Sequence, residues 1–295
     1  MATMTPTRGL GQQQAGLGNR NRKLIQRILS YALLVFFALV FMLPILWMFT
    51  TSIKSSAEWF TKEIRWIPNK PTLDNYRKIF DNPQAPMGRW FINSIGVATA
   101  ATVITLALDA LAAYAYARMH FPGRRILFAL LLATLFLPGL MFLVPNFLTI
   151  YRLGLLNSYA GVVLPSLASI FGVFFLRQFF ETIPHELEEA AEIDGANTWQ
   201  TFFRVVLPLA KPALATLAII TFLASWNDFL WPLLILQSPE RLTLPPGLAS
   251  LKSAYAQSYG QAMAGAMIAA APVLILYVAL QRFIVQSVAM TGLKG

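Results

Sequence analysis

The first long apolar stretch of the chain reads ILSYALLVFFALVFMLPILWMFTTSI, from residue 28 to residue 53. It contains no charged residue, whereas Arg27 and Lys54 stand directly at its two ends. A helix needs about 20 predominantly apolar residues to cross the roughly 30 Å hydrocarbon core of a membrane. The stretch is also longer than the apolar part of a cleaved signal peptide. It therefore predicts a transmembrane helix.

Five further charge-poor gaps extend this pattern along the chain. Their flanking charges are Arg89 and Arg118, Arg125 and Arg152, Arg152 and Arg177, Lys211 and Glu240, and Lys252 and Arg282. The gaps are continuously apolar and do not alternate as the strands of a membrane barrel do. The sequence therefore predicts an all-α, polytopic membrane protein with six transmembrane helices.

The composition of the 295 residues agrees with this class, since 57% are hydrophobic and 12% are charged. A soluble domain carries about 25% charged residues. The net charge of +10 is not gathered in a basic stripe, so nucleic acid is not an expected partner. Cys is absent, and the two histidines, His120 and His185, show no ligand spacing, so no metal site is predicted.

The spans divide the chain into five parts. We expect a mobile cytoplasmic tail at 1–27, the first transmembrane helix at 28–53, an external loop with short helices at 54–89, a five-helix core at 90–282 with an inside loop at 177–211, and a cytoplasmic tail at 283–295. Basic residues crowd the entrance to the first span, at Arg20, Arg22, Lys23 and Arg27. Because Lys and Arg favour the cytoplasmic flank of a span, both termini are predicted to be cytoplasmic.

The inside loop holds six of the 13 acidic residues. The run from Ile183 to Ile193 predicts a helix, with Pro184 in the first turn, where its missing N–H costs nothing. Gly195 is expected to stop this helix in a left-handed conformation. Asn197 or Thr198 can cap a second helix, over 199–206, that ends before a proline.

This loop resembles the signature loop of bacterial ABC importer permeases. That signature runs Glu-Ala-Ala, three residues, Gly, nine residues, Ile, one residue and Leu-Pro. The matching residues here are Glu189, Ala190, Ala191, Gly195, Leu207 and Pro208, with Val205 in place of Ile. Further matching pieces include Leu111-Ala-Ala-Tyr-Ala-Tyr-Ala-Arg118 and Trp226-Asn-Asp-Phe-Leu-Trp-Pro232. The chain looks like the second permease of the carbohydrate-uptake class, related to the maltose and glycerol-phosphate systems.

The resemblance implies a set of partners in and around a bacterial inner membrane. These are a second permease subunit, two copies of an ATP-binding subunit and an extracytoplasmic solute-binding protein. In that family the loop docks on the ATPase, which implies coupling through loop 184–208. The residues assigned to this docking are Glu189, Ala190, Ala191, Asp194, Gly195, Leu207 and Pro208. The family's C-terminal tail reaches the same partner, which implies a contact by Lys294 and Gly295.

The chain itself is not expected to be an enzyme. A phosphate-binding P-loop needs Gly-Lys followed by Ser or Thr, and no Gly-Lys dipeptide occurs in the sequence. ATP and Mg²⁺ are therefore expected on the partner subunits, and no cofactor is expected on this chain.

Two carboxylates, Asp109 and Asp228, lie within predicted spans, where a charge is costly and a functional role is the first hypothesis. Three roles remain open: proton carriers of a secondary transporter, an intramembrane aspartyl protease pair, or structural hydrogen bonding. Trp226-Asn227-Asp228 combines an aromatic ring with polar groups, which suits either a sugar site or a hinge. The residues predicted to line a substrate pathway are Asn93, Asn146, Trp226, Asn227 and Asp228.

Two further features of the spans bear on the pathway and its solute. Pro138 and Pro145 interrupt the third predicted span, as a bent pathway helix or as ordinary kinks. No Lys or Arg lies within a span, which favours a neutral solute such as a sugar over a phosphate.

Overall fold

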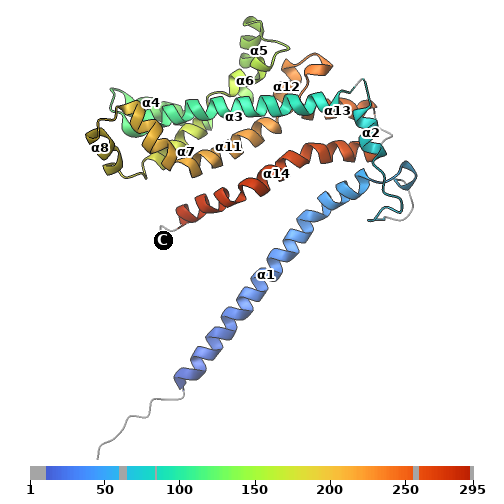
Figure 1. Ribbon diagram of the computed structural model, residues 1–295, viewed down its shortest axis with the longest axis horizontal. Helices are drawn as coiled ribbons and strands as arrows, with labels where there is room; N and C mark the ends of the chain where they lie inside the picture. Colours follow the sequence, from blue (N-terminus) through green and yellow to red (C-terminus); the bar gives the residue numbers. More distant parts are fainter. Residues whose placement is uncertain (1–10, 60–64, 84, 255–258, 293–295) are drawn as a thin grey trace, which may run out of the picture.

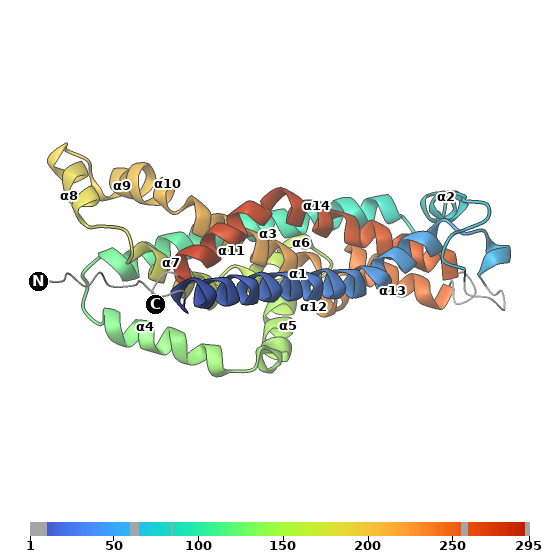
Figure 2. The ribbon, with the colours of Figure 1, turned by 90° about the horizontal axis from the view of Figure 1, so that it is seen from below.

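The computed structural model describes residues 11–59, 65–83, 85–254 and 259–292, and every regular element in these ranges is helical (Figures 1 and 2). The centre of the molecule is α3 (Met87–Arg118), which packs mainly against α7 (Ile170–Phe180) and α11 (Lys211–Trp226). Because α3 is long and apolar enough to cross a membrane, it confirms the span predicted between Arg89 and Arg118.

Two other long helices lie on one side of this centre. α1 (Gly11–Ser52) leans away from the bundle and packs mainly against α14 (Tyr259–Gly292), as Figure 1 shows. Both helices extend beyond the predicted span boundaries, so residues 11–27 and 283–292 of the predicted tails are helical. No proline occurs between residues 7 and 43, and the Gln, Leu, Lys and Arg residues there are good helix formers. Lys294 and Gly295 lie outside the described residues.

The remaining predicted spans are bent at short breaks. The first pair, bent by 99°, joins α4 (Arg124–Ala133) and η2 (Thr134–Phe136) to η3 (Gly139–Phe142) and α5 (Leu143–Arg152). The second, bent by 49°, joins α6 (Tyr159–Val163) and η4 (Leu164–Ser166) to α7. The third, bent by 77°, joins α9 (Thr198–Thr201), η5 (Phe202–Val206) and α10 (Leu207–Leu209) to α11. Its first half lies in the predicted inside loop 177–211, and only α11 falls within the span predicted between Lys211 and Glu240.

Three long helices and three bent pairs together allow six spans. The first break falls at Leu137–Pro138, where Pro138 is extended and has no N–H for a helical hydrogen bond. Pro138 therefore ends one helix and precedes another that runs in a different direction, and does not only bend a continuous helix.

The two ends of the molecule carry different short elements. At one end lie η1 (Ser56–Glu58), α2 (Asp74–Phe80), η6 (Pro239–Arg241) and α13 (Leu244–Ala254), with α12 (Leu230–Ile235) nearer the middle. At the other end lies α8 (Glu186–Ile193). Both views place the beginning of α1 and the end of α14 in the half of the molecule that contains α8 (Figures 1 and 2). The inside loop and the outer ends of these two helices therefore share one side.

Candidate functional site

Helix α8 ends in a Schellman motif. Gly195 has φ of 85°, and its N–H donates to the Glu192 carbonyl at 2.9 Å. The N–H of Ala196 donates to the Ala191 carbonyl, also at 2.9 Å. The predicted stop at Gly195 is confirmed. The helix is shorter than predicted, because Pro184 and His185 form the turn that precedes it and its first residue is Glu186.

The second loop helix starts with a capping box. The Asn197 side chain accepts from the Gln200 N–H at 3.0 Å, and the Gln200 side chain accepts from the Asn197 N–H at 2.9 Å. The helix was predicted to end before Pro208, but it continues to Leu209 through a π-helical segment, η5. The π segment changes the hydrogen-bond register directly before Pro208, which cannot donate.

A buried ion pair ties α8 to the end of α3. Arg118 Nε lies 2.6 Å from Glu188 Oε1, and the two side chains are 6% and 10% exposed. The Nε–H of Arg118 does not point at Glu188 Oε1, so the contact between them is mainly a charge attraction and not a linear hydrogen bond. The same guanidinium donates to the Ile183 carbonyl at 2.6 Å and contacts His185 Nε2 at 2.8 Å. The Tyr114 hydroxyl donates to Glu188 Oε2 at 3.3 Å.

An apolar core lies directly beneath this ion pair. The Tyr114 ring packs against Phe202 of η5, with centroids 4.9 Å apart, and against Phe180 of α7, with centroids 6.4 Å apart. The cluster continues through Val206 to Leu217 of α11. The loop is therefore packed as one body with α3, α7 and α11, because polar and apolar contacts reach all three helices.

The opposite face of the loop is largely exposed. Glu189, Ala190, Asp194 and Gly195 are exposed, while Ala191 is half-buried. Ile193 of α8 is 87% exposed and Trp199 of α9 is 62% exposed. At the bend into α11, Leu207 is half-buried against the core and Pro208 is exposed. Exposed apolar groups on a loop rich in acidic residues indicate a protein-binding surface.

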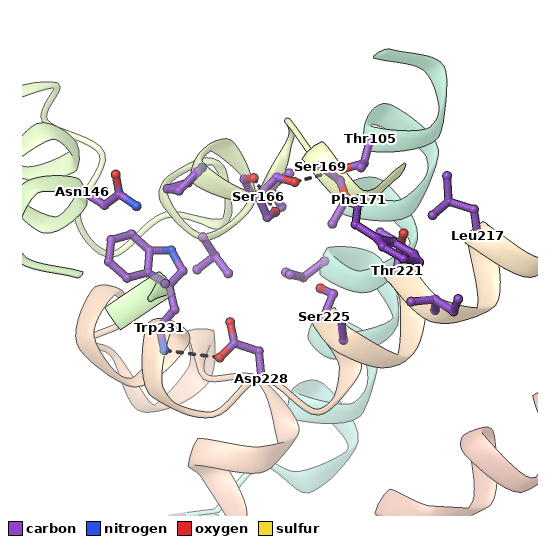
Figure 3. A pocket seen from close by; sticks show the side chains of 18 of the residues that line it. Thr105, Asn146, Ser166, Ser169, Phe171, Leu217, Thr221, Ser225, Asp228 and Trp231 are labelled. Carbon is purple, nitrogen blue, oxygen red and sulfur yellow. Dashed lines mark hydrogen bonds between the residues drawn. The ribbon is translucent and has the colours of Figure 1, made fainter. Parts of the chain in front are cut away.

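A cavity of about 400 Å³ lies in the middle of the bundle, bounded by α3, α5, α6, α7, α11 and α12 (Figure 3). Three helix breaks border it, since Gly139, Ser169 and Asp228 stand at breaks before η3, α7 and α12. Discontinuous helices are a common way for transporters to build a solute site within the membrane. The volume is within the range of small-molecule sites.

Hydroxyl groups, an amide and a carboxylate interrupt the apolar wall of this cavity. Figure 3 shows Asp228 and Trp231 on one side of it and the polar groups of the neighbouring helices around it. Asp228 Oδ1 accepts from the Trp231 N–H at 3.4 Å, and Trp231 Nε1 donates to the Gly161 carbonyl at 3.2 Å. The remaining polar lining residues are Thr105, Asn146, Ser166, Ser169, Thr221 and Ser225.

The predicted pathway residues divide into two groups. Asn146 and Asp228 line the cavity, whereas Asn93, Trp226 and Asn227 do not. Asn93 donates to the carbonyls of Glu240 and Leu242, both at 2.9 Å, and holds η6 against α3. Trp226 is buried and donates to the Ala269 carbonyl of α14 at 3.1 Å. Asn227 donates to a carbonyl of its own helix. Trp231 and the hydroxyl residues were missed from the sequence.

Asp109 lies apart from the cavity wall. Its Oδ1 accepts from the Ser169 N–H at 3.2 Å, and its Oδ2 is buried against Gly172 of α7 without a hydrogen-bond partner among the described residues. A side chain at position 172 would collide with this oxygen. Asp109 therefore holds the beginning of α7 against α3, while Asp228 faces the cavity. The two carboxylates do not form a shared site, as a protease pair would require.

These features define a polytopic helical transport subunit, with a solute-sized cavity among broken helices and an exposed loop joined to them. A family described as the binding-protein-dependent transport system inner membrane component matches residues 109–290. The chain is 36% identical over 264 residues to the diacetylchitobiose uptake system permease protein NgcG of Streptomyces coelicolor, covering 88% of this chain and 86% of the relative. It is 37% identical over 259 residues to the trehalose transport system permease protein SugB of Mycobacterium tuberculosis, covering 86% and 93%.

A solved structure has the same fold. The chain aligns with a TM-score of 0.76 and 27% identity to the crystal structure of a bacterial ABC transporter involved in the import of the acidic polysaccharide alginate. The alignment covers 94% of this chain and 99% of that chain. The protein belongs to the family of binding-protein-dependent inner membrane transport components.

Proposed function

We propose that the chain is a permease subunit of an ATP-driven importer, forming half of the path for a sugar or a related polar solute. One observation carries the proposal: an exposed loop surface is joined through a buried network to the helices that border a central cavity. Movement of the loop by a partner would move α3, α7 and α11 as a unit, which is how a rigid-body step changes access to a site.

The partner of the loop is a separate ATPase, present in two copies. Ile193 and Trp199 supply exposed apolar groups. Ala190 and Gly195 have little or no side chain, so the backbone of another chain can approach closely there. The acids Glu189 and Asp194 supply charge to the same surface. ATP and Mg²⁺ would be held by these partners, because this sequence has no P-loop.

The second half of the path is another permease subunit. The cavity is bordered on one side by η3 and α5, the second half of the first bent pair, and α1 extends away with its apolar side chains exposed. A membrane helix that leans out of its own bundle offers a surface to a neighbouring bundle as well as to lipid.

The side that carries α8 is assigned to the cytoplasm, together with both termini, in a bacterial inner membrane. Arginines gather there at the ends of α3 and α7 and the start of α4, in agreement with the preference of basic residues for the inside. The opposite end, with α2 and α13, is then the docking place for an extracytoplasmic solute-binding protein.

The solute assignment rests on the lining of the cavity. Trp231 offers a ring for stacking, and Asp228, Asn146 and the surrounding hydroxyls offer hydrogen bonds to sugar hydroxyls. None of the described residues that line the cavity is Lys or Arg, which favours a neutral solute. Relatives are named for sugars, although the solved relative is named for an acidic polysaccharide, so the solute class rests on these side chains.

The loop assignment is tested by two matched glycine substitutions. Gly195 and Gly154 both have positive φ (85° and 67°), and both have open space around the missing side chain. Valine is strained at either position by a similar amount, but only Gly195 lies in the loop. With the partner subunits present, Gly195→Val is expected to lower solute uptake about tenfold or more, and Gly154→Val to leave it within about twofold. Equal uptake in the two variants, at equal membrane levels, would reject the assignment.

A further inference from the structure

Arginines from two helices gather beside α3 at the end of the bundle that carries α8. Arg124 and Arg125 begin α4, directly after the turn at Gly123, and Arg177 lies in the last turn of α7. They line a cavity of about 350 Å³ together with Tyr116, Phe128, Ala129 and Leu132. The cavity therefore has three guanidinium groups and a floor of aromatic and aliphatic side chains.

The guanidinium of Arg177 is held in place by its neighbours. It lies over the Phe128 ring, 4.2 Å from the centroid, and its Nη2 is 2.6 Å from Glu181 Oε1. Its Nε donates to the Tyr116 carbonyl at 3.4 Å. A cation already fixed in position loses little conformational entropy when an anion binds.

The other two arginines lack a neutralising partner in the part of the chain that the structure describes. Arg124 donates to the Met119 carbonyl at 2.7 Å, and no carboxylate of the described residues lies within ion-pair distance of Arg124 or Arg125. Both also line a second hollow of about 450 Å³ on the other side of the turn, with His120, Phe121 and Ile126. Two cations therefore face open space between helix ends.

The flank of the arginine pocket is apolar and partly exposed. On α4, the pocket side of the helix carries Phe128, Ala129 and Leu132, of which Ala129 is exposed and the other two are half-buried. These side chains continue from the arginines along a helix that forms half of a candidate span. The surface thus has a cationic end at the level of a membrane interface and an apolar length beside it.

We propose that this pocket binds an anionic phospholipid. The phosphate would lie between Arg124, Arg125 and Arg177, where planar guanidinium groups can donate paired hydrogen bonds to its oxygens. The acyl chains would lie along Phe128, Ala129 and Leu132 on the same side of α4. Basic pockets between membrane helices are suited to such headgroups. A lipid accounts for both the cationic end and the apolar flank, whereas an acidic protein surface accounts for the first alone.

The test is lipid retention by the full chain, measured by native mass spectrometry from detergent with added phosphatidylglycerol or phosphatidylcholine. Wild-type protein is expected to retain phosphatidylglycerol preferentially. Each arginine near a headgroup contributes about a fivefold change in affinity, so Arg124→Gln/Arg125→Gln should weaken retention about 25-fold. The control, Lys78→Gln/Arg152→Gln, removes two exposed charges elsewhere and should change it less than twofold.

Three results would overturn the proposal. The first is equal retention of the two lipids by wild-type protein. The second is an equal loss in the test and control variants. The third is complete displacement of phosphatidylglycerol by millimolar inorganic phosphate, which would indicate a site for a free anion. An Arg124→Lys/Arg125→Lys variant keeps both charges, and its affinity is expected between those of wild type and the glutamine variant.

Discussion

Replacing Arg118 by methionine should loosen α8 from the bundle. The side chain of Glu188 is 10% exposed, and the substitution leaves its carboxylate without the cation that lies 2.6 Å away. Removing one partner of a buried ion pair costs about 3–5 kcal/mol. The contacts to the Ile183 carbonyl and to His185 disappear as well. Since α8 otherwise packs mainly on α9 and η5, most of this cost should appear as local opening of the loop.

Hydrogen exchange measures this opening directly. An opening free energy lowered by 3–5 kcal/mol corresponds to amide exchange roughly 150- to 4000-fold faster over residues 186–193. Exchange in the middle of α3 should change little. The matched control is Arg177→Met, which removes the half-exposed i,i+4 pair with Glu181. Such a pair contributes about 0.3–0.5 kcal/mol, and the other contacts of Arg177, to Phe128 and Tyr116, do not involve α8 either, so exchange over residues 186–193 should rise by no more than about threefold.

The double variant Arg118→Met/Glu188→Met separates loss of the pair from loss of the side chains. Two apolar residues of similar length remove the unpaired charge, so exchange should return most of the way toward wild type. The Ile183 carbonyl and the Tyr114 hydroxyl lose partners, which leaves about 1–3 kcal/mol of the defect. Unchanged exchange in Arg118→Met would refute the claim that the Arg118–Glu188 pair holds α8 on the bundle. So would a double variant in which the increases in exchange of the two single variants add up.

Two further sets of substitutions, each with its own control, test the interior of the bundle. Gly172→Ala should destabilise the protein by about 1–3 kcal/mol, because the new methyl group collides with Asp109, and Asp109→Ala should restore part of the loss. Gly96→Ala in α3, where nothing lies within 4 Å, is the control and should leave the melting temperature unchanged or raise it. Trp231→Phe should raise the KM for solute with little loss of thermal stability. Trp226→Phe should lower stability first, since this ring is buried in the core; the reverse pattern would contradict the cavity assignment.

The spans and the loop caps were readable from local signals. Uncharged lengths predict spans because the bilayer has a fixed thickness, and Gly195 and Asn197 act on neighbouring backbone groups. The cavity was harder to see. Thr221, Ser225 and Asp228 are spaced by four and three residues, the spacing of one helix face, and all three line the cavity. This spacing is a signal that would have separated Asp228 from Trp226 and Asn227.

Other features depend on contacts that a single sequence does not display. Arg118 and Glu188 are 70 positions apart, and nothing local indicates that the end of α3 meets α8. Pro138 predicted a kink, but the 99° bend depends on how α4 and α5 pack around the cavity. The helical structure of residues 11–27 in α1 and 283–292 in α14 was not predicted, because charged residues mark the edge of a membrane and not the end of a helix.

The most direct test of the central claim is uptake into proteoliposomes that contain this chain, its partner permease and the ATPase subunits. ATP is supplied on the side that carries α8, with the solute-binding protein and labelled sugar on the opposite side. Uptake is expected to require ATP and the ATPase, and to persist when the proton gradient is collapsed. Uptake by this chain alone, driven by a proton gradient without any ATPase, would contradict the proposal.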